Sequence, residues 1–326
     1  MNGLTNIWKY GLNDKALTQI TSGTGPDFSP MPDPGGKGIY FVNGKSAGFL
    51  TAYHVHSQQS TDIASENATQ PVVSPDGKRV MYITAPAKDR TELWVSNVDG
   101  SNKVKLATSK SLGTGFWAPD DFHLLFMEEQ PGTPDRAYSA AADGSGLRQI
   151  PWAGGGIQAL LWSTDQKSIY LNSFNQGTSK ATVWRANADG SNPEMIAEDC
   201  GHVFDAAPGG QYLITINRGA ALGISEISLA DRKCTPLLPS VVTFGIAFAP
   251  DGKSFLYAVP SRSEVTIYRQ GWRDGKLTGP TQVALKLPFA FPLLAGGNAY
   301  DISRDLSTVV YARPGGQADL YLLSQK

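Results

Sequence analysis

The sequence predicts an all-β protein: a seven-bladed β-propeller whose blades are four-stranded antiparallel sheets. Three observations carry this prediction. A proline-centred motif recurs at a nearly constant interval, aspartate–glycine turns recur between its copies, and the strand-like segments at the two ends of the chain complement each other. We expect residues 1–326 to form this propeller as one domain.

The recurring motif reads Ser-Pro-Asp-Gly-Lys at 74–78 and Ala-Pro-Asp-Gly-Lys at 249–253, each time before an apolar run. Weaker copies precede similar runs elsewhere. We call the residue at the proline position the anchor of its unit. Successive anchors are 42 to 45 residues apart except for the last pair, which are 54 apart. This regularity predicts seven units, with anchors at residues 30, 75, 119, 164, 208, 250 and 304.

Between the anchors, a strand-like segment runs into an Asp-Gly pair and is followed by a second short strand. The pairs stand at 99–100, 143–144 and 189–190. Asp-Gly between apolar segments is typical of a hairpin turn, because glycine tolerates the positive φ that such turns need. Each unit therefore reads as strand, anchor turn, strand, loop, strand, Asp-Gly turn, strand.

The ends of the chain look like two parts of one blade. Residues 6–10 and 16–20 match the third and fourth strands of a unit, and residues 319–323 match a third strand with no fourth after it. We expect an N-terminal strand to close the last blade and so remove an exposed sheet edge. One copy of the third strand is then surplus.

Composition narrows the function classes. Charged residues are only 17% of the chain and the formal net charge is -1, which argues against nucleic-acid binding. No apolar run reaches the length of a membrane span, and the N-terminus lacks the pattern of a signal peptide. No Gly-rich phosphate loop is present, so no cofactor is expected.

On the motif at 74–78 and the Leu-Trp-Val-Ser-Asn-Val-Asp-Gly stretch at 93–100, the chain resembles the TolB-like, WD40-like propellers with PD40 repeats. Its sequence pattern is similar to that of the propeller sensor domains fused to bacterial Ser/Thr kinases or regulators. The resemblance implies a non-enzymatic sensor or interaction module, binding a protein or a small polar ligand, with a periplasmic or extracytoplasmic location.

A ligand would meet the mouth of the central channel, where the innermost strands begin. Six residues before each anchor lies the equivalent position of every unit, and its occupants mix hydroxyls, amides, one imidazole and one aromatic ring. Convergent polar groups around an apolar contact are typical of small-ligand sites. These positions hold Thr24, Thr69, Gly113, Gln158, His202, Phe244 and Asn298.

Two enzymatic alternatives stay open. His54 and His56 would share one face of a strand and could bind a metal, as in metal-dependent lyases of acidic oligosaccharides that resemble oligogalacturonate lyase. Such propellers also accompany peptidases, but no G-x-S-x-G motif is present, since residues 223–227 fail at the last position. We expect Cys200 and Cys234 to lie on opposite faces of the ring as free thiols.

Overall fold

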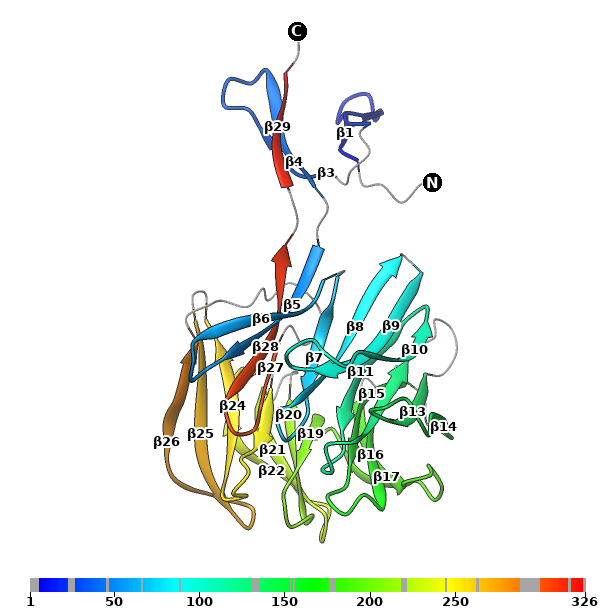
Figure 1. Cartoon of the computed structure of the whole chain (residues 1–326), viewed down its shortest axis with the longest axis vertical. Helices are drawn as coiled ribbons and strands as arrows, with labels where there is room; N and C mark the ends of the chain where they lie inside the picture. The colour runs from blue at the N-terminus through cyan, green and yellow to red at the C-terminus, as the bar shows by residue number, and fades with distance from the viewer. Residues whose placement is uncertain are drawn as a thin grey trace.

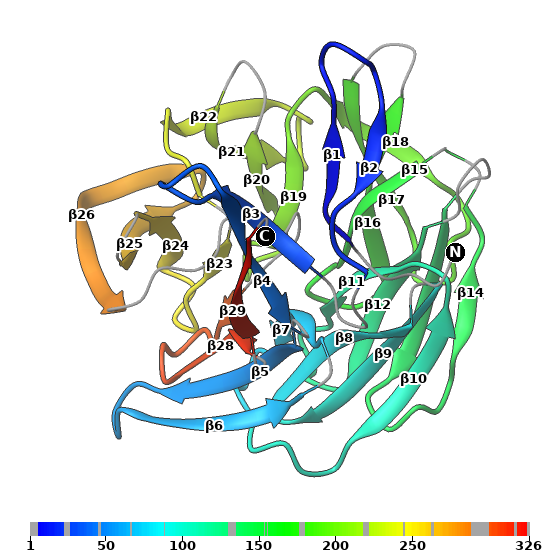
Figure 2. The same cartoon turned by 90° about the horizontal axis from the view of Figure 1, so that it is seen from above.

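The computed structural model describes residues 6–22, 27–44, 47–65, 67–87, 89–129, 135–152, 154, 156–175, 180–217, 222–243, 245–261, 264–287, 300–315 and 318–324. Every regular element among them is a β-strand. Four-stranded sheets surround a central axis, and a smaller sheet stands off one face of this ring (Figures 1 and 2). No helix in these ranges is long and apolar enough to cross a membrane. The predicted all-β propeller of four-stranded antiparallel sheets is confirmed.

Five sheets of the ring each consist of four strands that are consecutive in the chain. Their strand order matches the predicted unit, with the innermost strand first and the anchor turn after it. The first is β7 (Thr69–Val73), β8 (Arg79–Ala87), β9 (Arg90–Asn97) and β10 (Val104–Ser109); the second is β11 (Leu112–Trp117), β12 (His123–Glu128), β13 (Arg136–Ala141) and β14 (Arg148–Ile150); the third is β15 (Gly156–Trp162), β16 (Ser168–Asn175), β17 (Lys180–Asn187) and β18 (Glu194–Glu198); the fourth is β19 (His202–Ala206), β20 (Tyr212–Asn217), β21 (Gly223–Ser228) and β22 (Cys234–Pro239); the fifth is β23 (Ile246–Phe248), β24 (Ser254–Pro260), β25 (Val265–Arg273) and β26 (Lys276–Leu287).

The anchor turn is held by its own side chains. The Ser74 hydroxyl donates to Asp76 Oδ1 at 2.6 Å and accepts from the Arg79 amide at 3.0 Å. Gly77 takes a φ of 73°, in the left-handed region that favours glycine. The same serine–aspartate bond recurs in two other units, between Ser163 and Asp165 and between Ser303 and Asp305.

The predicted Asp-Gly turns are present where β9, β13 and β17 end. In each, the aspartate Oδ1 accepts from the amide and the hydroxyl of the serine two residues later, and the glycine has a positive φ of 81°, 84° or 86°. The turn chemistry therefore follows directly from the local sequence.

The core lies between neighbouring sheets. Leu93 and Val95 of one sheet, for example, pack with Leu124 and Phe126 of the next. Six such clusters join the sheets pairwise around the ring. One of them connects the first sheet to a sixth, shared sheet, and another connects the fifth sheet to it.

The shared sheet joins the two ends of the chain in the order β27 (Tyr300–Ile302), β28 (Thr308–Gly315), β5 (Ala47–His54) and β6 (Gln59–Ala64). Strands from the N-terminal part of the chain close the last blade, as predicted, but they are β5 and β6 and not residues 6–20. Strands β1 (Trp8–Tyr10) and β2 (Leu17–Gln19) pair with each other and are exposed. The eight-residue β5 provides a longer ladder for β28, and its Leu50 and Ala52 are fully buried against the next sheet.

The first anchor lies in a three-stranded sheet outside the ring, in the order β29 (Ala318–Ser324), β4 (Gly38–Gly44) and β3 (Asp27–Pro32). We call this sheet the arm. Seven sheets thus contain one anchor each, as the repeat predicts, and six of them form the ring among the described residues. Residues 288–299, which belong to the long last interval, lie outside the described residues.

Candidate functional site

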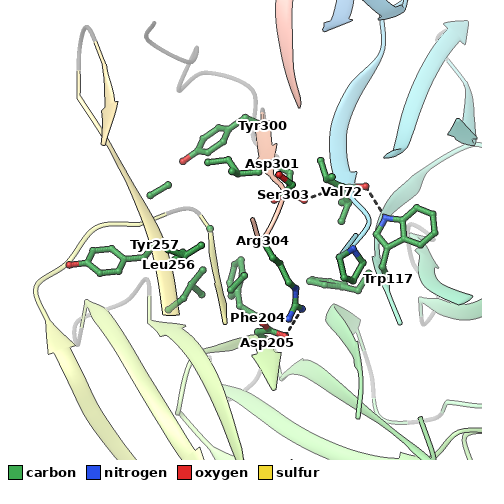
Figure 3. A pocket seen from close by; sticks show the side chains of 18 of the residues that line it. Val72, Trp117, Phe204, Asp205, Leu256, Tyr257, Tyr300, Asp301, Ser303 and Arg304 are labelled. Carbon is green, nitrogen blue, oxygen red and sulfur yellow. Dashed lines mark hydrogen bonds and ion pairs between the residues drawn. The ribbon is translucent and has the colours of Figure 1, made fainter. Parts of the chain in front are cut away.

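A cavity of about 140 Å³ lies on the axis of the ring. All six innermost strands contribute to its wall, so it is a widening of the central channel. Apolar and aromatic side chains make up most of this wall, and its charged members are two aspartates and one arginine. Figure 3 shows the principal lining residues, among them Val72, Trp117, Phe204, Asp205, Leu256, Tyr257, Tyr300, Asp301, Ser303 and Arg304.

Arg304 supplies the positive charge of the cavity. Its side chain is 32% exposed, and Nη2 lies 3.0 Å from Asp205 Oδ1, on the other side of the channel (Figure 3). Asp205 is buried and accepts two backbone amides as well, from Ala206 at 2.9 Å and from Phe248 at 2.8 Å. A carboxylate held in this way fixes the guanidinium, whose planar fork of donors suits carboxylate or phosphate groups.

Asp301 occupies the same position in its unit as Asp205, three residues before the anchor. Its Oδ2 accepts from the Val73 amide of the next sheet at 2.7 Å, just as Asp205 accepts from Phe248. Burial raises the pKa of Asp301 to about 6, against the opposing effect of backbone amides and of Arg304. Burial also raises the pKa of the neighbouring Tyr300. The cavity therefore contains a carboxyl group that titrates within the physiological range.

The predicted mouth residues lie at or near the beginning of the inner strands, before the residues that line the cavity. Thr69 and His202 begin β7 and β19 and are half-buried, Gln158 is exposed in β15, and Gly113 lies in β11. None of these four lines the cavity. Thr24, Phe244 and Asn298 lie outside the described residues. Whether the predicted residues contact a ligand stays a prediction.

Sequence reasoning missed the three charged residues of the cavity, although two signals were present. Aspartate recurs three residues before an anchor at Asp27, Asp205 and Asp301. Arg304 replaces the proline of the motif, which is a departure toward a charged residue at a position that faces the channel. The proline is also replaced at Thr164, so the clue to the site was the charge at 304 and not the loss of proline alone.

The histidines do not converge. Strand β5 ends at His54, and His56 lies in the turn that follows, so the two do not share a strand face as predicted. His123 Nδ1 lies 2.6 Å from Asp120 Oδ2 beside an anchor turn rather than at the cavity. Within the described ranges, no group of three or more His, Cys, Asp or Glu side chains could hold a metal ion.

Cys200 and Cys234 are both free, as predicted. The prediction that they lie on opposite faces is wrong. Cys234 packs against the same apolar cluster that contains the buried Cys200, and the two thiols form a hydrogen bond. This bond raises the pKa of Cys200 and lowers the pKa of Cys234.

No family model matches the chain. Among curated proteins, an uncharacterized peptidase of Bacillus subtilis, YuxL, is 24% identical over 200 residues, which are 59% of this chain and 29% of the relative. Dipeptidyl-peptidase 5 of Porphyromonas endodontalis is 26% identical over 203 residues, 57% of this chain and 28% of the relative. The chain thus spans less than a third of the length of these two relatives.

Solved structures support the propeller fold. A putative TolB from Agrobacterium tumefaciens has a TM-score of 0.57 at 15% identity, covering 83% of this chain and 99% of its own. TolB from Acinetobacter baumannii gives 0.53 at 13%, covering 84% and 65%. An oligogalacturonate lyase in complex with manganese gives 0.51 at 15%, covering 82% and 83%. At these identities the likeness extends to the fold and not to the chemistry.

Proposed function

We propose that the protein is a non-enzymatic recognition propeller that binds a ligand bearing an acidic group in the central channel. The observation that carries this proposal is the partly exposed side chain of Arg304, whose guanidinium is held by the buried Asp205 within a mainly apolar cavity. A guanidinium fixed before the ligand arrives loses little entropy on binding, which favours a specific contact.

The wall suits a ligand with an apolar body beside its acidic group. Trp117, Phe204 and Tyr257 offer aromatic surface, and Asp301 offers an acceptor or, when protonated, a donor. A carboxylate-bearing segment of a partner protein and a small organic acid share this chemistry. The role is that of a sensor or interaction domain of the TolB-like, PD40-repeat kind, comparable to the propellers fused to bacterial kinases.

The similarity to an oligogalacturonate lyase with manganese makes a metal-dependent lyase the second candidate. It needs a histidine cluster at the channel, and His54, His56 and His123 do not line the cavity. A third candidate, the accessory propeller of a peptidase, follows from the two curated relatives. In that case the channel would bind or admit a peptide.

The experiment compares wild type with Arg304→Ala on an array of short peptides that end in a free carboxylate or in an amide. Arg232→Ala is the matched control, because Arg232 forms an exposed ion pair with Glu194 away from the channel. We expect carboxylate peptides to bind and to lose about tenfold or more in affinity with Arg304→Ala, but not with the control. Unchanged binding to Arg304→Ala would contradict the proposal.

The same preparations also test the enzymatic candidates. Wild type is incubated with trigalacturonate and Mn²⁺, and separately with a dipeptidyl nitroanilide. We expect no turnover of either substrate. Release of many molecules of unsaturated sugar per molecule of protein would instead establish the lyase.

A further inference from the structure

The arm exposes apolar side chains that its repeat position would normally bury. Leu320 is 69% exposed, Leu322 51% and Met31 63%. Their neighbours Tyr321 and Leu323 on β29 are also exposed. By contrast, the third strands of the ring bury their apolar residues fully, as Leu93, Val183, Ile224 and Val265 show. Both faces of the arm thus expose apolar side chains, and none of the six apolar clusters among the described residues includes a residue of the arm.

The strand pairs of the arm and of the shared sheet have the same register. Gly38 pairs with Ser324 and Gly44 with Ala318 in the arm, and the same pairing resumes from Ala47 opposite Gly315 to His54 opposite Thr308 in the shared sheet. Residues 38–44 with 318–324 and residues 47–54 with 308–315 thus pair in one common register, and we call these two stretches together the long ladder. Figure 1 shows it as the blue and red strands that leave the ring together.

In the five consecutive sheets, the second and third strands of a unit form a hairpin with each other instead. Both segments of the long ladder carry hairpin-turn residues at their midpoints. The sequence reads Asn-Gly-Lys-Ser at 43–46 and Pro-Gly-Gly-Gln at 314–317. The same residues can thus pair locally, β4 with β5 and β28 with β29, exchanging two ladders for two others.

Asp27 provides an independent observation. It lies three residues before the first anchor, as Asp205 and Asp301 do before theirs. Those two each accept the backbone amide that stands two residues before the anchor of the neighbouring unit. Asp27 is 2% exposed, and its Oδ2 is buried without a hydrogen-bond partner among the described residues. A buried carboxylate oxygen in this state is unfavourable.

The amide that Asp27 would accept is that of Val73, which precedes the second anchor, and Asp301 occupies it here. The occupation follows directly from the shared sheet lying next to the β7 sheet. If a sheet were inserted between these two, the Val73 amide would donate to Asp27 instead. The Phe28 amide, which holds the matching position of the first unit, would then donate to Asp301.

We propose that the arm docks into the ring between the β27 and β7 sheets as a seventh blade. In this arrangement β3, β4, β5 and β6 form one sheet, and β29 pairs with β28. The occupant of the apolar surface is the ring of the same chain. The docking buries the exposed faces of β29, satisfies Asp27, and widens the channel by one blade. This inference does not depend on the proposed ligand.

Cross-linking between Lys37 and Lys78 tests the proposal. Lys37 lies in the β3–β4 turn, next to Gly38, and Gly38 pairs with Ser324 near the C-terminus, at the far end of the arm (Figure 1). Lys78 is exposed in an anchor turn of the ring. Anchor turns of consecutive units are neighbours, since the Asp76 amide donates to Asp121 Oδ1 at 2.7 Å. The seven-bladed ring therefore brings the two lysines together.

The monomeric fraction is treated with a short bis-succinimidyl ester, and the linked peptides are identified by mass spectrometry. We expect a Lys37–Lys78 product and no Lys37–Lys167 product, because Lys167 lies two units farther round the ring. Absence of the Lys37–Lys78 product, while other lysine pairs of the ring are linked, would overturn the proposal. A product found solely in a dimeric fraction would also overturn it, because a second copy would then be the occupant.

A locked variant provides the matched control. Asn43 and Asp319 are opposite each other in the arm, so Asn43→Cys with Asp319→Cys, in a Cys200→Ala, Cys234→Ala background, ties β4 to β29. We expect the oxidised variant to lose the Lys37–Lys78 product and the reduced variant to regain it. If the product persists with the disulfide formed, the re-pairing of β4 is wrong.

Discussion

Replacing Asp301 with asparagine should stabilise the protein at neutral pH. Burial in the channel wall raises the pKa of this carboxyl to about 6, whereas its ordinary value is 3.8. The folded state then binds its proton more tightly than the unfolded state. Stability from this group is therefore greatest at low pH, decreases as the pH rises from about 4 to 6, and stays low above that range. Asparagine keeps an acceptor for the Val73 amide without the buried charge.

The magnitude follows from the pKa. A value of about 6 against 3.8 corresponds to about 3 kcal/mol, at about 1.4 kcal/mol per pH unit. Because Asp301 is half-buried at the edge of a cavity, solvent screening reduces the expected gain to about 1–2 kcal/mol. The assay is urea unfolding of wild type and Asp301→Asn between pH 4 and pH 8. The two unfolding free energies should converge near pH 4, separate between about pH 4 and pH 6, and differ by a constant amount above pH 6.

Asp165→Asn is the control of opposite sign. The Ser163 hydroxyl bond lowers the pKa of this exposed aspartate, so its contribution is present at neutral pH and is lost as the pH falls. This variant should be less stable than wild type at pH 7 and equal to it at low pH. A loss of stability in Asp301→Asn at pH 7, or a difference that does not change with pH, would refute the reasoning on the channel carboxyl.

Three further predictions concern packing and reactivity. Asp205→Ala should lower the free energy of unfolding by about 3–5 kcal/mol, because it removes a buried carboxylate that accepts two hydrogen bonds from backbone amides and forms an ion pair with Arg304. A loss below about 1 kcal/mol would contradict this. Gly190→Ala should cost about 1–3 kcal/mol, since its φ is 86° and a Cβ would lie 2.8 Å from a backbone oxygen, whereas Gly209→Ala, with open space around it, should change Tm little. Iodoacetamide should alkylate Cys234 at a lower pH than Cys200, by peptide mapping, because their mutual hydrogen bond lowers the pKa of the first and raises that of the second; equal rates would argue against that bond.

Local chemistry explains what the sequence could predict. The anchor turn and the Asp-Gly turn each depend on residues within five positions of one another, such as Ser74 with Asp76 and Arg79. Because the two turns recur in each unit, they predicted the order of the strands within a unit and the position of its innermost strand. The same locality explains the confirmed positive φ of Gly100, since the turn type alone requires it.

Long-range pairing was the part that the sequence could not predict. The partner of β28 is β5, more than 250 residues away, and several strand-like segments near the N-terminus were equally suitable by pattern. Burial of Leu50 and Ala52 against the next sheet decides among them, and burial depends on the assembled ring. The thiol pair was missed for the same reason, because the loop between the third and fourth sheets brings Cys200 to the apolar cluster on which Cys234 of the fourth sheet packs.

The channel site shows a similar limit. Counting back from the anchors located the inner strands correctly, but the cavity lies nearer to the anchors than the predicted mouth residues. Arg304 stands at an anchor position itself, and its ion pair crosses the channel to Asp205 in another sheet. A repeat pattern specifies what successive units share, whereas this contact joins units that are not adjacent in the chain.

The most direct test of recognition in the channel is a crystal structure after soaking with a panel of small carboxylate, amine and neutral fragments. We predict that carboxylate fragments occupy the axial cavity with an oxygen on the Arg304 guanidinium, and that Arg304→Ala crystals lose this density. Carboxylate fragments found on the outer strands, with the cavity free of them across the whole panel, would contradict the account.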